Sequence, residues 1–185
     1  MRVVAGSWRG RKLTAPPGRE TRPTTDRVKE AIFSILGGAI REARVVDLCC
    51  GAGGLGIESL SRGAGHVDFV DLSWQALEAV RCNLETCGAE PSRYRLWRQD
   101  ACGWLATPGD DLAARDIILA DPPYAGDLAV DVWRACSRLA DAGRCVLVVL
   151  EHVPGLTLPP PPAGWRVDQR RYGAAALSIM ERDDE

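Results

Sequence analysis

The chain has 185 residues, of which 46% are hydrophobic and 26% charged, a composition typical of one globular domain with a layered core. No apolar run exceeds six residues and the first residues lack the apolar stretch of a secretory signal, so the sequence argues against a membrane protein and a secreted one. Seven cysteines without a C-x-x-C pair, and only two histidines, favour reduced thiols in a cytoplasm and argue against a disulfide framework or a metal site.

The net charge of −2 is unevenly distributed along the chain. Residues 1–29 carry eight Lys and Arg against two acids, a local charge of +6, which leaves −8 on the remaining 156 residues. A basic segment on an acidic body favours a polyanionic partner, because neutralising phosphates releases counterions. Trp8, among these basic residues, offers a face on which a base could stack. The sequence therefore favours a nucleic-acid partner, with a solvated basic surface as the alternative.

The first 23 residues are predicted to form a basic arm. Residues 2–5 and 11–14 are short strand-like runs joined by a glycine-bounded turn, which predicts a β-hairpin. Prolines at 16, 17 and 23 then keep the chain extended. Thr24 or Thr25 can cap a following helix with an apolar face at helical spacing, and two glycines stop it. We expect this helix, over residues 24–37, to join the arm to the main domain, residues 24–185.

Strand-like and helical patterns alternate from residue 44 onward. The predicted strands are Val45–Cys49, Val67–Val70, Tyr94–Trp97, Ile117–Ala120, Cys145–Leu150, Trp165–Tyr172 and Ala175–Met180. The clearest helix follows Ser73 and stops at Gly88. Such alternation predicts a Rossmann-like α/β fold with a mostly parallel seven-stranded sheet covered on both faces. The last two strands are joined by a short turn at Gly173, so they must form a C-terminal antiparallel hairpin.

A glycine-rich loop follows the first of these strands. Residues 45–56 read VVDLCCGAGGLG, a strand, a tight G-x-G-x-x-G turn and a helix start, which is typical of a nucleotide-type cofactor site. This spacing alone is also compatible with NAD. Asp47 beside the loop would repel a pyrophosphate and attract the ammonium and sulfonium groups of S-adenosylmethionine (SAM), so it favours SAM. The alternative is that Asp47 only accepts hydrogen bonds from the loop backbone.

Four consecutive parallel strands are predicted to end close to an aspartate. These residues are Asp47, Asp71, Asp100 and Asp121. Ligands of open α/β sheets bind outside the carboxyl ends of the strands, so all four would line one rim. Asp71 could hold the two hydroxyls of a ribose, and Asp100 the exocyclic amine of an adenine.

The Asp121-Pro122-Pro123-Tyr124 stretch carries the predicted chemistry. Two prolines fix the backbone and remove two donors, which leaves the Asp121 carboxylate and the Pro122 carbonyl as rigid acceptors beside the ring of Tyr124. Such a set suits a planar base with an exocyclic amine. The acceptors would bind its N–H groups, the ring would contact its face, and the amine nitrogen would be presented to an electrophilic methyl group.

These residues resemble the RsmD family of bacterial 16S ribosomal RNA guanine-N2 methyltransferases. The resemblance covers nearly the whole chain and rests on residues 2–6 (RVVAG), 9–13 (RGRKL), 22–30 (RPTTDRVKE), 47–56 (DLCCGAGGLG), 60–64 (LSRGA) and 121–124 (DPPY). DPPY is shared with other amino-methyltransferases, whereas RPTTDRVKE and RGRKL are more discriminating. The chain differs from the family at Cys49 and Cys50, commonly an aromatic residue and Ala, and at Asp71, usually Glu. We interpret both cysteines as small packing residues rather than nucleophiles.

The resemblance implies a SAM-dependent methyltransferase fold and a set of site residues. SAM would be bound by Asp47, Gly51, Gly53, Asp71 and Asp100, and the target base by the catalytic residues Asp121, Pro122, Pro123 and Tyr124. The target would be the N2 amine of a guanine, guanine 966 by resemblance, in 16S rRNA or a small-subunit assembly intermediate. Arg9, Arg11, Lys12, Arg22 and Arg27 would bind the RNA. We expect a cytoplasmic monomer without a metal ion.

Three other functions are compatible with parts of the sequence. An adenine-N6 methyltransferase acting on DNA or RNA can share the DPPY turn, although 185 residues leave little mass for reading a base sequence in a groove. A non-catalytic RNA-binding module could keep the same fold. An NAD oxidoreductase could use the glycine loop, but no histidine is evident in the predicted cleft for hydride transfer.

Overall fold

A computed structural model describes residues 1–16, 25–106, 117–124, 126–143 and 147–183. The strands are β1 (Arg44–Leu48), β2 (His66–Asp71), β3 (Tyr94–Arg98), β4 (Ile117–Ala120), β5 (Leu147–His152), β6 (Trp165–Tyr172) and β7 (Ala175–Arg182). The helices are α1 (Asp26–Leu36), α2 (Gly54–Ser61), α3 (Trp74–Cys87), α4 (Ala101–Ala106) and α5 (Leu128–Asp141), with short 3-10 helices at Gly37–Ile40 and Pro91–Arg93. Within these described residues no helix is both long and apolar enough to cross a bilayer.

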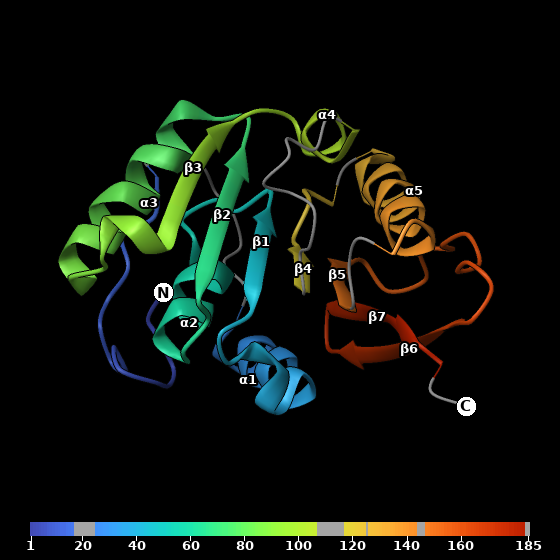
Figure 1. Ribbon diagram of the computed structural model, residues 1–185, viewed down its shortest axis with the longest axis horizontal. Helices are drawn as coiled ribbons and strands as arrows, with labels where there is room; N and C mark the ends of the chain where they lie inside the picture. The colour runs from blue at the N-terminus through green and yellow to red at the C-terminus, as the bar shows by residue number, and fades with distance from the viewer. Residues whose placement is uncertain (17–24, 107–116, 125, 144–146, 184–185) are drawn as a thin grey trace.

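The strands form one seven-stranded sheet in the order β3-β2-β1-β4-β5-β7-β6 (Figure 1). The first five strands are parallel, and β7 pairs antiparallel with both β5 and β6. The parallel strands run in the same direction, so their carboxyl ends meet at one edge, at the top of Figure 1. The predicted fold class and the C-terminal hairpin are therefore confirmed. In the hairpin, β6 has the predicted range, whereas β7 extends beyond the predicted end at Met180 to Arg182. The structure describes β5 from Leu147 to His152.

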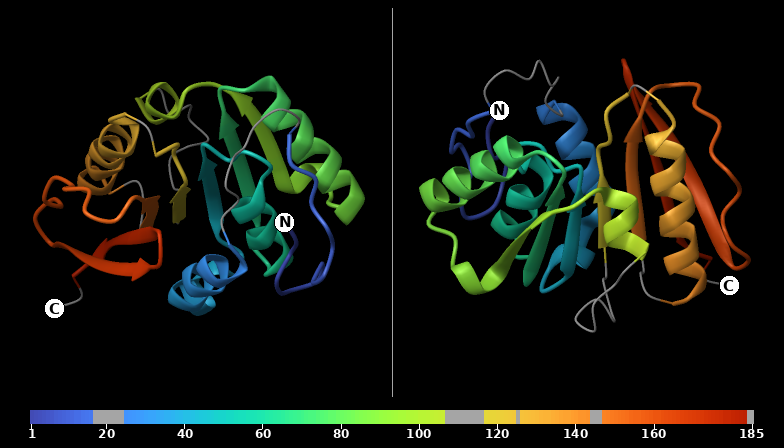
Figure 2. Two further views of the ribbon diagram at one scale, coloured as in Figure 1. Left: turned by 180° about the vertical axis from the view of Figure 1, so that it is seen from behind. Right: turned by 90° about the horizontal axis from the view of Figure 1, so that it is seen from above.

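Helices cover both faces of the sheet, as the views in Figure 2 show. One core joins α1, α2 and α3 to the face that carries Phe69, Leu119 and Val149. The other core joins α4 and α5 to the opposite face, which carries Val70 and Leu150. Parallel strands buried on both sides need apolar residues at nearly every position, which is why these segments read as continuous apolar runs rather than as alternating ones.

The predicted helix signals are confirmed at both ends of α1 and α3. The Thr25 hydroxyl accepts the backbone N–H of Val28 at 3.3 Å, and α1 ends where Gly37 takes a φ of 50°. The Ser73 hydroxyl accepts the N–H of Ala76, and Gly88 ends α3 in the left-handed conformation. A capping oxygen and a terminal glycine satisfy the end groups of a helix, so they mark its limits in the sequence.

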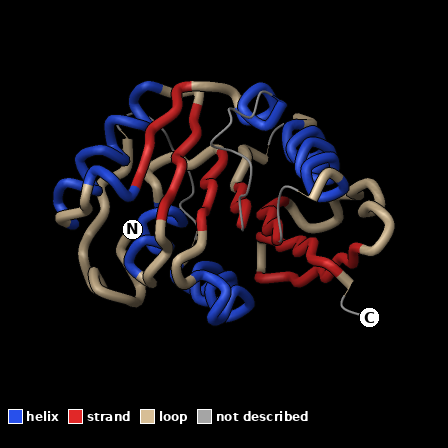
Figure 3. The backbone as a smooth tube through the Cα atoms, viewed as in Figure 1, coloured by secondary structure: helices blue, strands red, loops and turns tan. Residues whose placement is uncertain are grey.

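The predicted N-terminal hairpin is wrong. Residues 1–16 contain no strand and only one isolated antiparallel bridge, between Arg2 and Lys12, so Figure 3 draws them as loop. Three backbone hydrogen bonds join residues 1–3 to residues 10–13, but the pairing stops there because the next backbone groups bond to a helix. The N–H groups of Val4 and Ala5 donate to Glu58 of α2, at 2.7 and 2.9 Å.

Further along, the segment is held by Ser61 and Asn83. The Ser7 N–H donates to the Ser61 carbonyl, and the Trp8 N–H to the Ser61 hydroxyl. Thr14 exchanges two hydrogen bonds with the Asn83 side chain on α3. Gly6 is needed at this contact, because a Cβ there would lie 1.9 Å from the Ser61 carbonyl oxygen. The predicted division between residues 23 and 24 lies outside the described residues.

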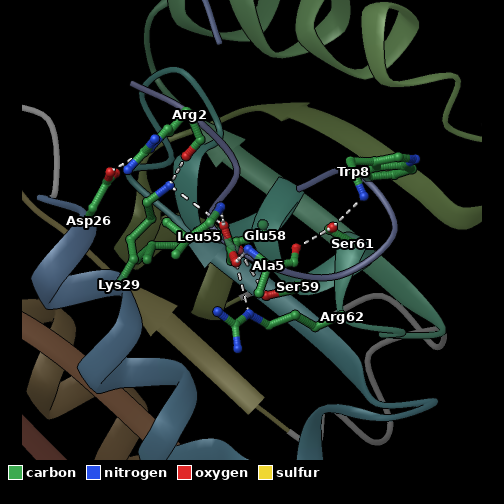
Figure 4. Close-up of polar contacts among 12 residues, drawn as sticks. Arg2, Ala5, Trp8, Asp26, Lys29, Leu55, Glu58, Ser59, Ser61 and Arg62 are labelled. Atoms are coloured by element: carbon green, nitrogen blue, oxygen red, sulfur yellow. Dashed lines mark hydrogen bonds and ion pairs between the residues drawn. The ribbon is translucent and has the colours of Figure 1, made fainter. Parts of the chain in front are cut away.

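A buried ion pair fastens this N-terminal segment, residues 1–14, to α1 and α2 (Figure 4). Lys29 and Glu58 are both fully buried, with Nζ 3.6 Å from Oε2. The Lys29 ammonium also donates to the Arg2 carbonyl, and the Arg62 guanidinium donates to Glu58 at 2.8 Å. Burial lowers the pKa of Lys29, and Glu58 opposes that shift. The predicted linking helix thus contributes a charge to the core as well as an apolar face.

Candidate active site

The sheet register directs several acids to the same face at the carboxyl ends of the strands. Asp47 of β1 lies beside Leu119 of β4 and Phe69 of β2. Asp71 and Asp121 each follow one of those neighbours by two residues. Because side chains alternate along a strand, all three acids share the face that α1, α2 and α3 cover. Asp121 and Asp71 both help to raise the pKa of Asp47, which is consistent with three acids close together at this edge.

Asp47 is buried against the start of α2. Its Oδ2 accepts the Gly56 N–H at 2.8 Å, so the loop-capping contact considered from the sequence is present. Burial raises the pKa of Asp47 well above its usual range, the Gly56 bond opposes that shift, and Asp121 and Asp71 add to it. A carboxyl group in this setting is costly to ionise unless a cation is nearby. The Asp47 carboxyl group therefore favours its neutral form unless a cation comes close to it.

The glycine loop has one open position and two packed ones. Gly51 has a φ of 54°, and a Cβ there would meet nothing within 4 Å, so its backbone borders open space. A Cβ at Gly53 would lie 3.1 to 3.2 Å from core side chains, and one at Gly56 only 2.3 Å from the Phe69 ring. Gly51 is thus placed to approach a ligand closely, whereas Gly53 and Gly56 allow α2 to pack on the sheet.

Asp71 closes the far side of the loop. Its two oxygens accept the N–H groups of Gly51, at 3.0 Å, and Ser73, at 2.8 Å. A shallow hollow beside it is lined by Leu72, Ser73, Trp74, Gln75 and Arg98. Leu72 and Trp74 are exposed here although both are large and apolar. The hollow provides a surface of mixed polar and apolar side chains next to the acid predicted to bind a ribose.

Asp100 lies at the same edge of the sheet, since the N–H of its neighbour Gln99 donates to the Asp71 carbonyl at 3.2 Å. It is exposed and begins α4, where its Oδ1 accepts the Gly103 N–H at 2.8 Å and its carbonyl accepts the Trp104 N–H. The structure therefore shows a helix-capping contact at this residue. It remains at the carboxyl end of β3, two residues beyond the strand.

The Asp121–Tyr124 turn directly follows β4, which ends at Ala120. The Asp121 N–H donates to the Leu48 carbonyl at 3.3 Å, so the turn leaves the sheet beside β1. Pro122 is buried, whereas Pro123 and Tyr124 are exposed, with 42% of Tyr124 accessible. The Tyr124 hydroxyl donates to Oε1 of Glu151 at 3.1 Å. An aromatic side chain is thus held at the rim with much of its surface open.

The two adjacent cysteines are packing residues in the described structure. Cys50 is buried in the core beneath α1, α2 and α3, and Cys49 packs against the opposite core. Burial raises the pKa of Cys49 to about 12, with contributions from Asp71, Asp121 and Asp47, and burial also raises the pKa of Cys50. Thiols that stay protonated at neutral pH are poor nucleophiles, which supports the packing interpretation. Cys49 also has a φ of 56°, unusual for a residue with a side chain.

The basic residues predicted to contact RNA lie on the N-terminal segment and on α1. Arg9, Lys12 and Arg27 are exposed. Arg11 is also exposed, but its guanidinium donates to the Thr86 carbonyl near the end of α3, so it helps to hold the segment in place. Trp8 packs partly against the core. Arg22 lies outside the described residues.

Sequence reasoning missed Glu151, which lies at the carboxyl end of β5 and is only 5% exposed. Its signal was the same as that of Asp121, an acid directly after an apolar run, but the sequence did not reveal its contact with Tyr124. The buried Lys29–Glu58 pair was also missed, because each residue alone reads as part of a solvated helix surface. Among the described residues, no group of three or more His, Cys, Asp and Glu could hold a metal ion.

The fold and the rim define a class of protein. A parallel sheet with an antiparallel β7 inserted between β5 and β6, and a glycine loop after β1, is the arrangement of SAM-dependent methyltransferases. The chain matches the family described as Conserved hypothetical protein 95 over residues 1–181. It therefore belongs to this family, the RsmD family.

Similar proteins are found among sequences and among solved structures. The chain is 31% identical to "Ribosomal RNA small subunit methyltransferase D" of Escherichia coli (strain K12) over 187 residues, which cover 99% of this chain and 90% of that protein. It is 46% identical to YlbH of Bacillus subtilis (strain 168) over 126 residues, 67% of each chain. The solved structure of yhhF from Escherichia coli has a TM-score of 0.83 and 31% identity, covering 100% of this chain and 99% of that one.

Proposed function

We propose that this protein is a SAM-dependent methyltransferase that methylates the exocyclic N2 amine of a guanine in 16S rRNA. The observation that carries the proposal is the Asp121–Tyr124 turn, whose acid lies within electrostatic reach of Asp47 at the glycine loop. Similarity to a small-subunit rRNA methyltransferase over 99% of the chain supports the substrate class. The specific target, guanine 966, follows from the family resemblance alone.

Asp47, Gly51 and Asp71 are proposed to bind SAM and Asp100 to contact its adenine, and Gly53 is included on the family resemblance alone. Buried Asp47 suits the cationic end of the cofactor, and the open backbone at Gly51 suits close approach. Asp71 holds the Gly51 and Ser73 backbone beside the hollow that Leu72 and Trp74 line, which suits a ribose bound there. When bound, SAM supplies an electrophilic methyl group and a neutral leaving group.

The catalytic work is assigned to the turn after β4. The Asp121 carboxylate and the Pro122 carbonyl accept the two N–H groups of the guanine amine, which favours localisation of the nitrogen lone pair. The Tyr124 ring contacts the face of the base. Bound SAM would supply the methyl group to the amine nitrogen and leave as a neutral thioether, and the methylated amine would give one proton to the Asp121 carboxylate or to water. Positioning and electrostatics supply most of the rate, because no strong base is needed before transfer.

Incubation with labelled SAM and small subunits that lack the modification tests this function. We expect one labelled guanine, located by mapping the methylated nucleotide. Asp121→Ala should lower the turnover rate by about 10²-fold or more while RNA still binds. Asp127→Ala is the matched control, since this exposed acid on the same loop makes no side-chain cap contact with α5.

Each alternative predicts a different result in the same assay. Methyl transfer to duplex DNA but not to rRNA or subunits would favour an adenine-N6 methyltransferase. RNA binding without any transfer would favour a non-catalytic module. Calorimetry that detects NAD binding and no SAM binding would indicate an oxidoreductase. Unchanged methylation by the Asp121→Ala variant would refute the role given to that residue.

A further inference from the structure

Glu151 extends the rim beyond the four aspartates. The last register pair of β4 and β5 joins Ala120 to Leu150, so Asp121 and Glu151 are the next residues on neighbouring strands. Adjacent parallel strands lie about 4.8 Å apart, which places the two backbones side by side at the carboxyl ends. Glu151 lies two residues after Val149, so its side chain leaves the sheet on the face that also carries Asp47 and Asp71.

A buried carboxylate at this position is unfavourable for the fold alone. The strands on both sides of β5 bury apolar residues, and Leu177 of β7 lies opposite Glu151 in the register. Burying an ionisable group costs stability, and each hydrogen bond to that group offsets part of the cost. The contact that Glu151 makes with Tyr124, from hydroxyl to Oε1 at 3.1 Å, is therefore a reason to look for a role in the site.

This hydrogen bond holds one end of the Tyr124 side chain. The hydroxyl is fixed at a residue of the rigid sheet, whereas 42% of Tyr124 stays accessible on the loop that follows β4. A tyrosine without such an anchor would lose rotational freedom when a base binds, and ordering one side chain on binding weakens affinity by up to about tenfold. Because the hydrogen bond orders the Tyr124 side chain when the protein folds, binding of the base does not have to order it again.

We propose that Glu151 is a positioning residue that presents the Tyr124 ring to the target base. The proposal rests on the proposed function and adds a fifth strand to the site. Glu151 acts through the tyrosine hydroxyl, so removing either partner should have the same effect on binding of the RNA substrate.

A double-mutant cycle tests this inference with Glu151→Ala, Tyr124→Phe and the double variant. We expect each single substitution to raise KM for the RNA about tenfold, with a smaller change in kcat, and the double variant to match the singles. Glu151→Gln should restore most of the loss, because its amide oxygen can accept the same hydrogen bond. The dissociation constant for SAM should not change. Glu181→Ala, a carboxylate at the opposite end of the β5–β7 ladder, is the control.

Several outcomes would overturn the inference. These are an unchanged KM in Tyr124→Phe, a hundredfold rise in the double variant, or an equal loss of SAM binding in Glu151→Ala. Tyr124→Phe removes a single hydroxyl and keeps the ring, so it decides the matter even where Glu151→Ala does not fold. A wild-type protein without methyl transfer would refute the proposed function instead. The same cycle measured by urea unfolding would then still show whether the two side chains are coupled.

Discussion

At the scale of one residue, Asp47 shows how a residue of the predicted cofactor site can lower the stability of the folded protein. Its carboxyl group is buried near two other acids, and burial raises its pKa. Ionisation is therefore less favourable in the folded protein than in the unfolded chain. The stabilising contribution of such a group is complete below its unfolded pKa of about 3.9 and is lost as the pH rises through its folded pKa. A bound cation would favour the ionised form.

We expect Asp47→Asn to become more stable than the wild type as the pH rises. Asparagine keeps an oxygen to accept the Gly56 N–H but carries no charge. The difference in unfolding free energy should grow above about pH 4, by up to about 1.4 kcal/mol per pH unit, until the folded pKa is passed. Urea unfolding at a series of pH values measures it.

The same variant should bind SAM at least about tenfold more weakly at neutral pH, because the cofactor's cationic end loses its counter-charge. Calorimetry checks this loss. A stability difference that stays constant between about pH 4 and pH 8 would contradict the assignment. Unchanged SAM affinity would show that Asp47 only caps the loop.

At the scale of secondary-structure elements, α2 connects the N-terminal segment with the glycine loop. The helix begins at Gly54, just after the loop, and Glu58 one turn later accepts two N–H groups of the segment. Asn83 of α3 forms a second connection, since its amide donates to both Thr14 and the Ala52 carbonyl in the loop. The segment that carries the predicted RNA contacts is thus bonded to the elements that carry the predicted cofactor site.

We expect Glu58→Ala to lower the unfolding free energy by about 3–5 kcal/mol, because it leaves Lys29 buried without its carboxylate and removes acceptors for two backbone N–H groups. The matched control is Asp131→Ala on α5. Its ion pair with Arg134 is exposed, with 54% and 57% of the side chains accessible, so the loss should stay below about 1 kcal/mol. Urea unfolding compares the two, and equal losses would mean that burial of the pair is not decisive.

The sequence predicted elements well where local signals agreed. The caps at Thr25 and Ser73 and the stops at Gly37 and Gly88 lie where expected, because a helix end must satisfy its own backbone. The prediction of an N-terminal hairpin was wrong because it rested on the strand propensity of Val3 and Val4. In the structure the backbone N–H of Val4 donates instead to Glu58, which is 54 residues away in the sequence. Local propensity does not encode such a distant partner.

At the scale of the whole molecule, the predicted cofactor site is acidic and the residues predicted to bind RNA are basic. The acids gather at the carboxyl ends of the strands, whereas the exposed basic residues Arg9 and Lys12 lie on the N-terminal segment. The sequence predicted the row of acids because parallel strands bring their carboxyl ends together. It did not reveal the helix-capping contact of Asp100 or the tyrosine contact of Glu151, since both depend on the positions that loops and side chains take at the rim.

Charge reversal of Arg9 and Lys12 should weaken RNA binding and leave SAM binding nearly intact. Removing two phosphate contacts should also reduce the salt dependence of RNA affinity, by a slope of about 1.4 to 1.8. Arg11 is left in place because its contact with Thr86 holds the segment. Filter binding at several salt concentrations measures the change, with Arg134→Glu on α5 as the control. An equal loss of SAM binding would mean that these residues are structural.

The attachment of the N-terminal segment also determines the order in which the protein can assemble. Its hydrogen bonds to Glu58 and Asn83 close loops of 53 to 69 residues. Closing long loops costs entropy before any contact is gained. The acceptors on Glu58 and Asn83 are in position only after α2 and α3 have packed on the strands. The earliest residues of the chain are therefore among the last to find their places, and hydrogen exchange during refolding would show their amides protected late.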